Sequence, residues 1–231
     1  MPFSIPHTPV YSRPLSRSGA ATAYTLLALA LFLTGVGILI GATFAPIILR
    51  GGFLFLLAIA ELAIVWTAPS WSRTSPTNVL LFITFPILSG ITITPFILSV
   101  AIGYVNGAMM LLNATIATTL LTLSSAVAAS MSQRDLGLHY GFMVMQGLIG
   151  LLIFGLLQVF FPSLRGGPIE TMMSGLGVVL FAVFLAIDFQ RLQRQGQADS
   201  PFLLALSLYL DIFNLFLYVV RFMLSISDRH R

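Results

Sequence analysis

Residues 205–223 read ALSLYLDIFNLFLYVVRFM, a stretch in which one carboxylate, Asp211, stands among side chains suited to a lipid bilayer. The six residues before Asp211 are all apolar or carry only a hydroxyl group. On insertion scales an Asp at the centre of a membrane helix costs about 2.5–3.5 kcal/mol, so such residues normally face the interior of a helix bundle and find a partner. The stretch therefore raises the question of which group Asp211 meets.

The composition is that of an integral membrane protein. Of the 231 residues, 58% are apolar and 8% are charged, whereas a soluble domain carries about 25% charged residues. The absence of cysteine excludes disulfides and thiolate metal sites. The eleven basic residues, all arginines, are scattered singly between apolar spans, so the net charge of +4 does not indicate a nucleic-acid partner. This composition indicates a protein that is embedded in a lipid bilayer.

Apolar runs long enough to cross a membrane follow one another along the chain. A span needs about 20 apolar residues to cross a hydrocarbon core about 30 Å thick. We therefore predict an all-α integral membrane protein with seven transmembrane helices, at about 20–44, 52–68, 77–100, 105–131, 140–161, 169–189 and 202–226. Residues 1–19 are expected to form a disordered cytoplasmic tail, residues 20–226 the seven-helix domain, and residues 227–231 a C-terminal tail.

The distribution of arginines gives an orientation. Cytoplasmic loops are enriched in Arg and Lys. The N-terminal tail and the loops on its side carry six arginines and the opposite side carries four, which favours a cytoplasmic N-terminus. With seven full spans the C-terminus then lies outside; if the last segment is re-entrant, the C-terminus returns to the cytoplasmic side.

Two further acids, Glu61 and Asp188, fall within apolar segments. If the sixth helix continues to about Gln195, Asp188 lies about 10 Å from its end, and Asp211 lies about 15 Å beyond Pro201, at 1.5 Å per residue. The last two helices are antiparallel neighbours joined by a short loop. Both carboxylates are therefore expected at a similar level on the same side of the membrane, where they could form a pair.

A pair of carboxylates in contact inside a membrane cannot ionise fully without a large cost. The two groups would share a proton and titrate in coupled steps. When both are ionised, they would suit a hard cation such as Ca²⁺, which prefers oxygen ligands. The alternative is that each acid separately bonds a neighbouring Tyr, Asn or Arg and only fixes the packing.

Two other polar residues are candidates for a part in this site. Arg73 follows the second span on the same predicted side as the aspartates. It is either an interface anchor beside Trp71 or a latch that reaches in and neutralises the carboxylates. Asn214 falls one turn after Asp211 and could support its carboxylate.

Four stretches together resemble the Bax inhibitor-1-like family, the transmembrane Bax-inhibitor-motif proteins. ALSLYLDIFNLFLYVVRFM is similar to the family's last-segment signature, and GLGVVLFAVFLAIDFQRLQ to its sixth helix. SGITITPFI resembles its third-helix motif, and AIAELAIVW its second helix with an embedded glutamate. The resemblance covers roughly residues 20–226 and points to a prokaryotic member.

The resemblance implies a bundle with a central last helix and a calcium-permeable leak pathway that responds to pH. The family's paired aspartates map onto Asp188 and Asp211. Its gating arginine follows a tryptophan by two positions, as Arg73 follows Trp71, although counting from Glu61 reaches Ser72 instead. Glu61 matches the embedded glutamate, which lies along the ion path or packs against it.

We accordingly expect a pH-sensitive calcium leak channel or transporter in the cell (inner) membrane, a monomer that is not an enzyme and uses no cofactor. Asp188 and Asp211 would sense protons and bind Ca²⁺ transiently. Two alternatives stay open. One is a non-transporting membrane adaptor that regulates stress or cell-death partners, as eukaryotic relatives are linked to cell-death control. The other is an intramembrane aspartyl protease, against which stands the lack of a YD…GxGD pattern.

Overall fold

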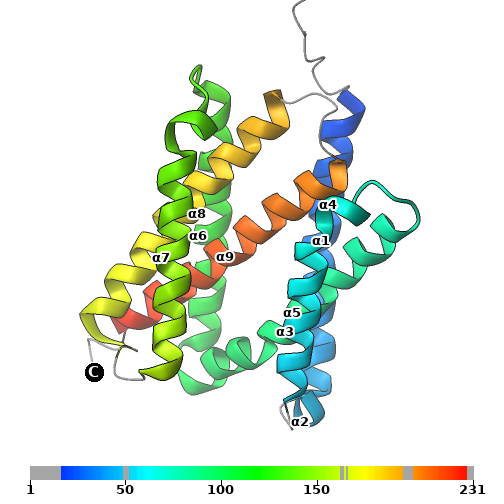
Figure 1. Cartoon of the computed structure of the whole chain (residues 1–231). Coiled ribbons are helices and arrows are strands. Elements are labelled where there is room, and N and C mark those ends of the chain that lie inside the picture. The colour runs from blue at the N-terminus through cyan, green and yellow to red at the C-terminus, as the bar shows by residue number, and fades with distance from the viewer. Residues whose placement is uncertain (1–16, 49–51, 162–163, 165, 195–199, 228–231) are drawn as a thin grey trace, which may run out of the picture.

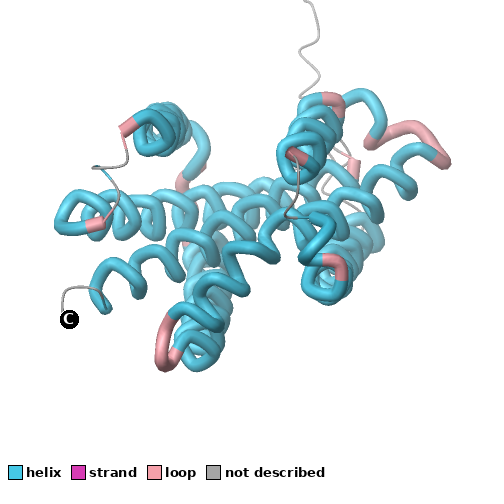
Figure 2. The backbone as a smooth tube through the Cα atoms, turned by 90° about the horizontal axis from the view of Figure 1, so that it is seen from below, coloured by secondary structure: helices cyan, strands magenta, loops and turns pink. Residues whose placement is uncertain are grey.

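The computed structural model describes residues 17–48, 52–161, 164, 166–194 and 200–227, and in these ranges it contains helices and no strand. The view in Figure 2 shows the same segments as helical rods joined by loops. In chain order the helices are α1 (Arg17–Thr43), α2 (Ala45–Ile48), α3 (Phe53–Trp66), α4 (Ala68–Trp71), α5 (Thr77–Gly103), α6 (Gly107–Met131), α7 (Leu136–Phe160), α8 (Gly167–Arg194) and α9 (Pro201–Ser227).

Six helices of the described chain are long and apolar enough to cross a membrane: α1, α5, α6, α7, α8 and α9. The segment expected to form the second span contains α3, whose 14 residues cover about 21 Å at 1.5 Å per residue. That length is below the roughly 30 Å of a hydrocarbon core, and the short helices α2 and α4 lie on either side of α3. The all-α membrane architecture is therefore as expected, but the count of seven full spans is not confirmed.

The ends of the chain differ in detail from the expectation. Helix α1 begins at Arg17, so Arg17–Gly19 are helical and do not belong to a disordered tail. Helix α9 is a continuous helix of 27 residues, about 40 Å long, which is long enough to cross a membrane. The rest of the two expected tails, residues 1–16 and 228–231, lies outside the described residues.

Helix α9 occupies the centre of the molecule, as Figure 1 shows. It runs diagonally between one group formed by α1, α3 and α5 and another formed by α6, α7 and α8. It packs most extensively on α8 and also contacts α1, α6 and α5. The buried residues of α9 include large apolar side chains and also Asp211, as expected for a helix that is enclosed by other helices.

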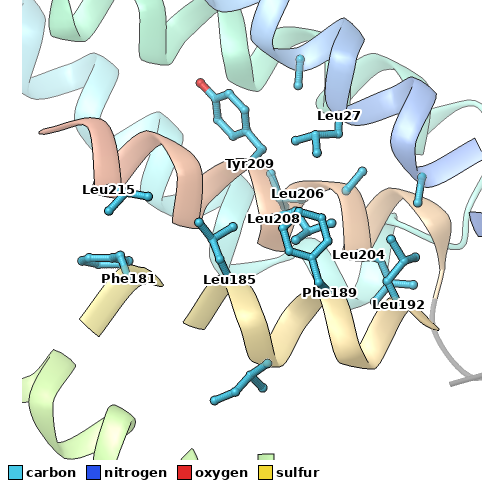
Figure 3. Close-up of a cluster of buried hydrophobic side chains, with 14 of the residues drawn as sticks. Leu27, Phe181, Leu185, Phe189, Leu192, Leu204, Leu206, Leu208, Tyr209 and Leu215 are labelled. Carbon is cyan, nitrogen blue, oxygen red and sulfur yellow. The ribbon is translucent and has the colours of Figure 1, made fainter. Parts of the chain in front are cut away.

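The main apolar core fills the space around α9. Figure 3 shows Leu204, Leu208 and Leu215 of α9 beside Leu185 and Phe189 of α8. Tyr209, which is completely buried, points from the opposite face of α9 toward α1. Burial of such side chains stabilises helix association by dispersion contacts, because inside a bilayer there is little hydrophobic driving force between helices.

Helices α1 and α5 approach each other closely through glycines. A Cβ added at Gly37 would collide with the backbone oxygen of Ile87, and one at Gly90 would collide with that of Thr34. Small residues at such positions let two helix backbones come together. The Gly37–Gly41 pair is thus used for packing within this one chain.

Candidate functional site

Asp188 and Asp211 both lie buried at the interface between α8 and α9. Their exposed fractions are 6% and 9%. Asp188 precedes the end of α8 by six residues and Asp211 follows the start of α9 by ten, or about 9 Å and 15 Å of helix. The two helices are antiparallel neighbours, as the sequence indicated.

Asp188 has partners on both helices. Its Oδ2 accepts a hydrogen bond from the Ser207 hydroxyl of α9, and its Oδ1 lies 3.3 Å from Nη1 of Arg191, three residues further along α8. Ser207 precedes Asp211 by one helical turn, so the two residues lie on the same face of α9. The bond from Ser207 therefore brings Asp188 beside the face that carries Asp211.

Asp211 is the less satisfied member of the pair. In the part of the chain that the structure describes, its Oδ2 is buried and has no hydrogen-bond partner. The charges of Asp188 and Arg191 both act on it. A buried carboxylate without partners is strongly disfavoured when ionised. A proton or a cation at Oδ2 would remove that cost, and this arrangement is what a proton sensor or a transient cation site needs.

One arginine in contact with the pair is Arg191, which the sequence analysis did not single out. Its side chain is 45% exposed, so the guanidinium bridges the buried carboxylate and the surface. The D-F-Q-R spacing, i and i+3 on one helix, was a signal that could have found it. Ser207 bonds Asp188 from the neighbouring helix, so no spacing along one helix signalled it.

Arg73 lies exposed in the turn after α4. The neighbouring Ser72 is buried, and its backbone oxygen accepts a 2.6 Å hydrogen bond from the Ser200 hydroxyl at the start of α9. This hydrogen bond holds the loop that carries Arg73 against the start of α9, the helix that carries Asp211. The role of Arg73 as a latch stays a prediction.

Glu61 forms a second polar centre on the other side of α9. Its carboxylate accepts hydrogen bonds from the Thr92 and Ser89 hydroxyls of α5. It lines a cavity of about 400 Å³, together with Asn214 and Arg221 of α9. Asn214 therefore lies in the Glu61 cavity, one turn of α9 beyond Asp211. Its amide donates a 2.8 Å hydrogen bond to the Leu210 carbonyl, and not to the Asp211 carboxylate that it was expected to support.

Tyr209 fastens the apolar region between the two centres. Its hydroxyl is 2.8 Å from the Thr34 hydroxyl of α1, and its ring meets Phe85 of α5 edge-on at 5.8 Å. Because residues two apart on a helix point in nearly opposite directions, Tyr209 faces α1 and α5 while Asp211 faces α8. The sequence showed the Y-L-D order but not what the tyrosine contacts.

The described residues contain no group of three or more His, Cys, Asp or Glu side chains that could hold a metal. Ca²⁺ takes about six to eight oxygen ligands, and two carboxylates supply at most four. A cation at the aspartate pair would therefore keep much of its water, which fits passage rather than tight storage.

These features define a class: a polytopic α-helical membrane protein with a buried acidic pair beside its central helix. A family model described as "Inhibitor of apoptosis-promoting Bax1" matches residues 17–229, and the chain belongs to this Bax inhibitor-1-like family. The resemblance seen in the four sequence stretches is thereby confirmed.

Similar proteins come from bacteria, animals and plants. The chain is 30% identical over 219 residues to the uncharacterized protein RP147 of Rickettsia prowazekii, covering 87% of this chain and 86% of that one. It is 26% identical over 172 residues to mouse protein lifeguard 4, covering 74% and 68%. It is 30% identical over 165 residues to LIFEGUARD 4 of Arabidopsis thaliana, covering 70% and 63%.

Proposed function

We propose that this protein is a pH-regulated leak pathway for Ca²⁺, in which Asp188 and Asp211 sense protons and transiently bind the ion. The observation that supports the proposal is the unpartnered Asp211 Oδ2, buried beside a second carboxylate. A purely structural acid in a helix interface would be fully hydrogen-bonded, as Asp188 is on both of its oxygens.

The charge balance of the pair gives the direction of the pH response. With one shared proton the two aspartates carry one negative charge, which Arg191 balances. Loss of that proton adds a second negative charge beside Arg191, and the carboxylates repel each other across the α8–α9 interface. Separation of these helices, with entry of water and a cation, relieves the repulsion. Flux is therefore expected to increase as the pH rises through the titration of the pair.

The remaining predicted site residues have supporting places in this scheme. The Glu61 cavity, with Asn214 on its wall, would be a polar vestibule on the far side of α9. Arg73 would hold the closed state from the loop fastened to Ser200. If so, Arg73→Gln should increase flux at low pH, whereas Arg134→Gln, in another exposed loop at the same end, should not.

We further propose that α3 with its flanking helices α2 and α4 completes a seventh crossing and that the Arg17 end faces the cytoplasm of a cell with this protein in its inner membrane. Because the chain has no cysteine, single cysteines can report sidedness. Phe44→Cys and Thr74→Cys, which lie before and after α3 and are both exposed, should react with a membrane-impermeant thiol reagent from opposite sides, Thr74→Cys from the cytoplasmic one. Labelling of the two from the same side would contradict a crossing by α3.

The direct test is Ca²⁺ flux into proteoliposomes over a pH series, because a coupled acid pair titrates in steps that a curve of flux against pH reports. The wild type is compared with the double variant Asp188→Asn, Asp211→Asn, which keeps the shapes of both side chains. Glu170→Gln, which replaces an acid at the other end of α8, is the matched control. Elution volume and thermal unfolding check that all three proteins are folded.

Flux that rises with pH in the wild type and the control, but not in the double variant, supports the proposal. The absence of Ca²⁺ flux from folded wild-type protein at every pH refutes the leak function. In that case the non-transporting adaptor takes its place, since an adaptor should tolerate both asparagine substitutions.

A further inference from the structure

Helix α6 carries an inward face of small and hydroxyl-bearing side chains. Its members recur at helical spacing and are the buried Ala114, Thr118, Ser125 and Ala129 and the half-buried Thr122. Helix α6 packs against both α8 and α9, so this face lies toward the interface that contains the aspartate pair. The Ser125 hydroxyl confirms the direction, because it donates a 2.9 Å hydrogen bond to the Ala182 carbonyl of α8.

Two hydroxyls on this face are unsatisfied. Within the described chain, Oγ1 of Thr118 and Oγ1 of Thr122 are buried and have no hydrogen-bond partner. Thr118 is only 5% exposed. By contrast, the exposed Thr115 and Thr119 of the same helix each bond the carbonyl four residues earlier, at 2.9 Å. Buried hydroxyls of proteins nearly always have a partner, which can be an ordered water or ion.

Two hydrogen bonds between helices give the level of this face relative to Asp211 along the bundle. Ser207 of α9 meets Asp188, so Asp211 is level with about residue 184 of the antiparallel α8. Ser125 meets Ala182, so the same level on α6 is at about residue 127. At 1.5 Å per residue, Thr122 then follows about 8 Å beyond Asp211 and Thr118 about 14 Å beyond it.

We propose that the Thr118 and Thr122 hydroxyls hold water and a partly hydrated divalent cation, and that they continue the ion path from Asp211 along α6. This inference rests on the proposed leak function. Hydroxyl and carboxylate oxygens are ligands that Ca²⁺ accepts, and a cation in this path keeps several waters. The offsets of about 6–8 Å between successive residues along the bundle leave room for waters between the side-chain oxygens. The negative charge of Asp211 selects a cation rather than an anion.

Thiol accessibility tests the site independently of transport. Thr122→Cys and Thr118→Cys are made in the cysteine-free chain and treated in proteoliposomes with a small, positively charged methanethiosulfonate. Ala30→Cys, completely buried in α1, is the dry control, and Thr119→Cys, exposed on α6, is the control for the lipid-facing side. We expect modification at positions 122 and 118, slowed by Ca²⁺ but not by Na⁺, and none at the two controls.

Two results overturn the inference. If the cysteines at positions 118 and 122 react no faster than Ala30→Cys, this face of α6 holds no water that the reagent can reach. If they react but Ca²⁺ does not slow the reaction, the positions are hydrated but do not bind Ca²⁺. Either result is obtained whether or not the wild type conducts Ca²⁺, so a failure of this site and a failure of the leak function are distinguishable.

Flux through valine variants gives the second measurement. Thr118→Val with Thr122→Val removes both hydroxyls at nearly constant shape, and Thr115→Val with Thr119→Val is the matched pair on the exposed side of α6. We expect flux to fall about tenfold or more in the first pair, the scale for loss of hydroxyl partners of an ion, and to be unchanged in the second. Equal flux in the two folded pairs contradicts the proposal.

Discussion

Replacement of Arg191 by glutamine should move the pH at which flux is half-maximal upward. Arg191 is a cation beside the aspartate pair, with Nη1 3.3 Å from Asp188 Oδ1. Its positive charge favours the fully ionised pair, which in the proposed scheme is the open form. Without that charge the last proton leaves only at higher pH, so the flux curve is displaced toward alkaline pH.

The size of the displacement follows from the geometry. Two unit charges 3.3 Å apart interact by about 1.3 kcal/mol in water and about 5 kcal/mol at an effective dielectric constant of about 20. Because the Arg191 side chain is 45% exposed, solvent screens the pair, and measured exposed pairs give about 0.2–1 kcal/mol. Taking about 1 kcal/mol, and about 1.36 kcal/mol per pH unit, the midpoint should rise by about 0.7 pH unit.

The assay is Ca²⁺ flux into proteoliposomes over a pH series at low and high salt. Arg191→Lys should keep most of the wild-type midpoint, and Arg134→Gln, an exposed arginine of the α6–α7 loop, should leave it unchanged. The displacement should shrink in about 1 M salt, where the screening length is only about 3 Å. A midpoint for Arg191→Gln that stays in place or falls would refute the charge-balance reasoning.

Three other substitutions test the structure around the site. Gly90→Ala should lower the thermal unfolding temperature, because its Cβ meets the Thr34 oxygen of α1 and overpacking costs about 1–3 kcal/mol; Gly35→Ala, which meets nothing within 4 Å, should not. Tyr209→Phe should destabilise the fold by about 1 kcal/mol through loss of its bond to Thr34, and the exposed Tyr24→Phe should be nearly neutral in the same unfolding measurement. Gln190→Ala should speed tryptic cleavage at Arg134 about tenfold, because Gln190 restrains local opening of the α6–α7 loop. The buried Gln190 side chain accepts a 2.7 Å hydrogen bond from the Leu136 N–H and donates a 2.8 Å bond to the Arg134 carbonyl. Gln193→Ala, on the exposed side of α8, is its control, and equal cleavage rates would show that Gln190 does not hold the loop.

The level of the two aspartates in the membrane could be predicted because a helix rises by a constant distance of about 1.5 Å per residue, which converts a count of residues into a distance along the helix axis. Asp188 and Asp211 sit on continuous helices joined by a short connection, so counting residues from that connection placed both acids together. Arg191 follows Asp188 by three residues, a spacing that places both side chains on one face of α8, whereas Ser207 reaches Asp188 from the neighbouring helix.

Contacts between distant segments could not be predicted in this way. The close approach of Gly90 to Thr34 depends on the crossing of α1 and α5, and the Tyr209 hydrogen bond depends on the rotation of α9 about its own axis. The hydropathy of residues 52–68 suggested a full span, but Gly52, with a positive φ of 75°, and the turn at Thr67 shorten the helix to Phe53–Trp66. Apolar composition reports what surrounds a segment, and it does not report where the helix ends.

The central position of α9 has a consequence for biosynthesis. Every helix that α9 contacts precedes it in the chain, so each of them leaves the ribosome first. Until α9 arrives, the Asp188 carboxylate lacks Ser207 and the Thr34 hydroxyl lacks Tyr209. Insertion of α9 therefore completes the polar contacts of both groups of helices in one step.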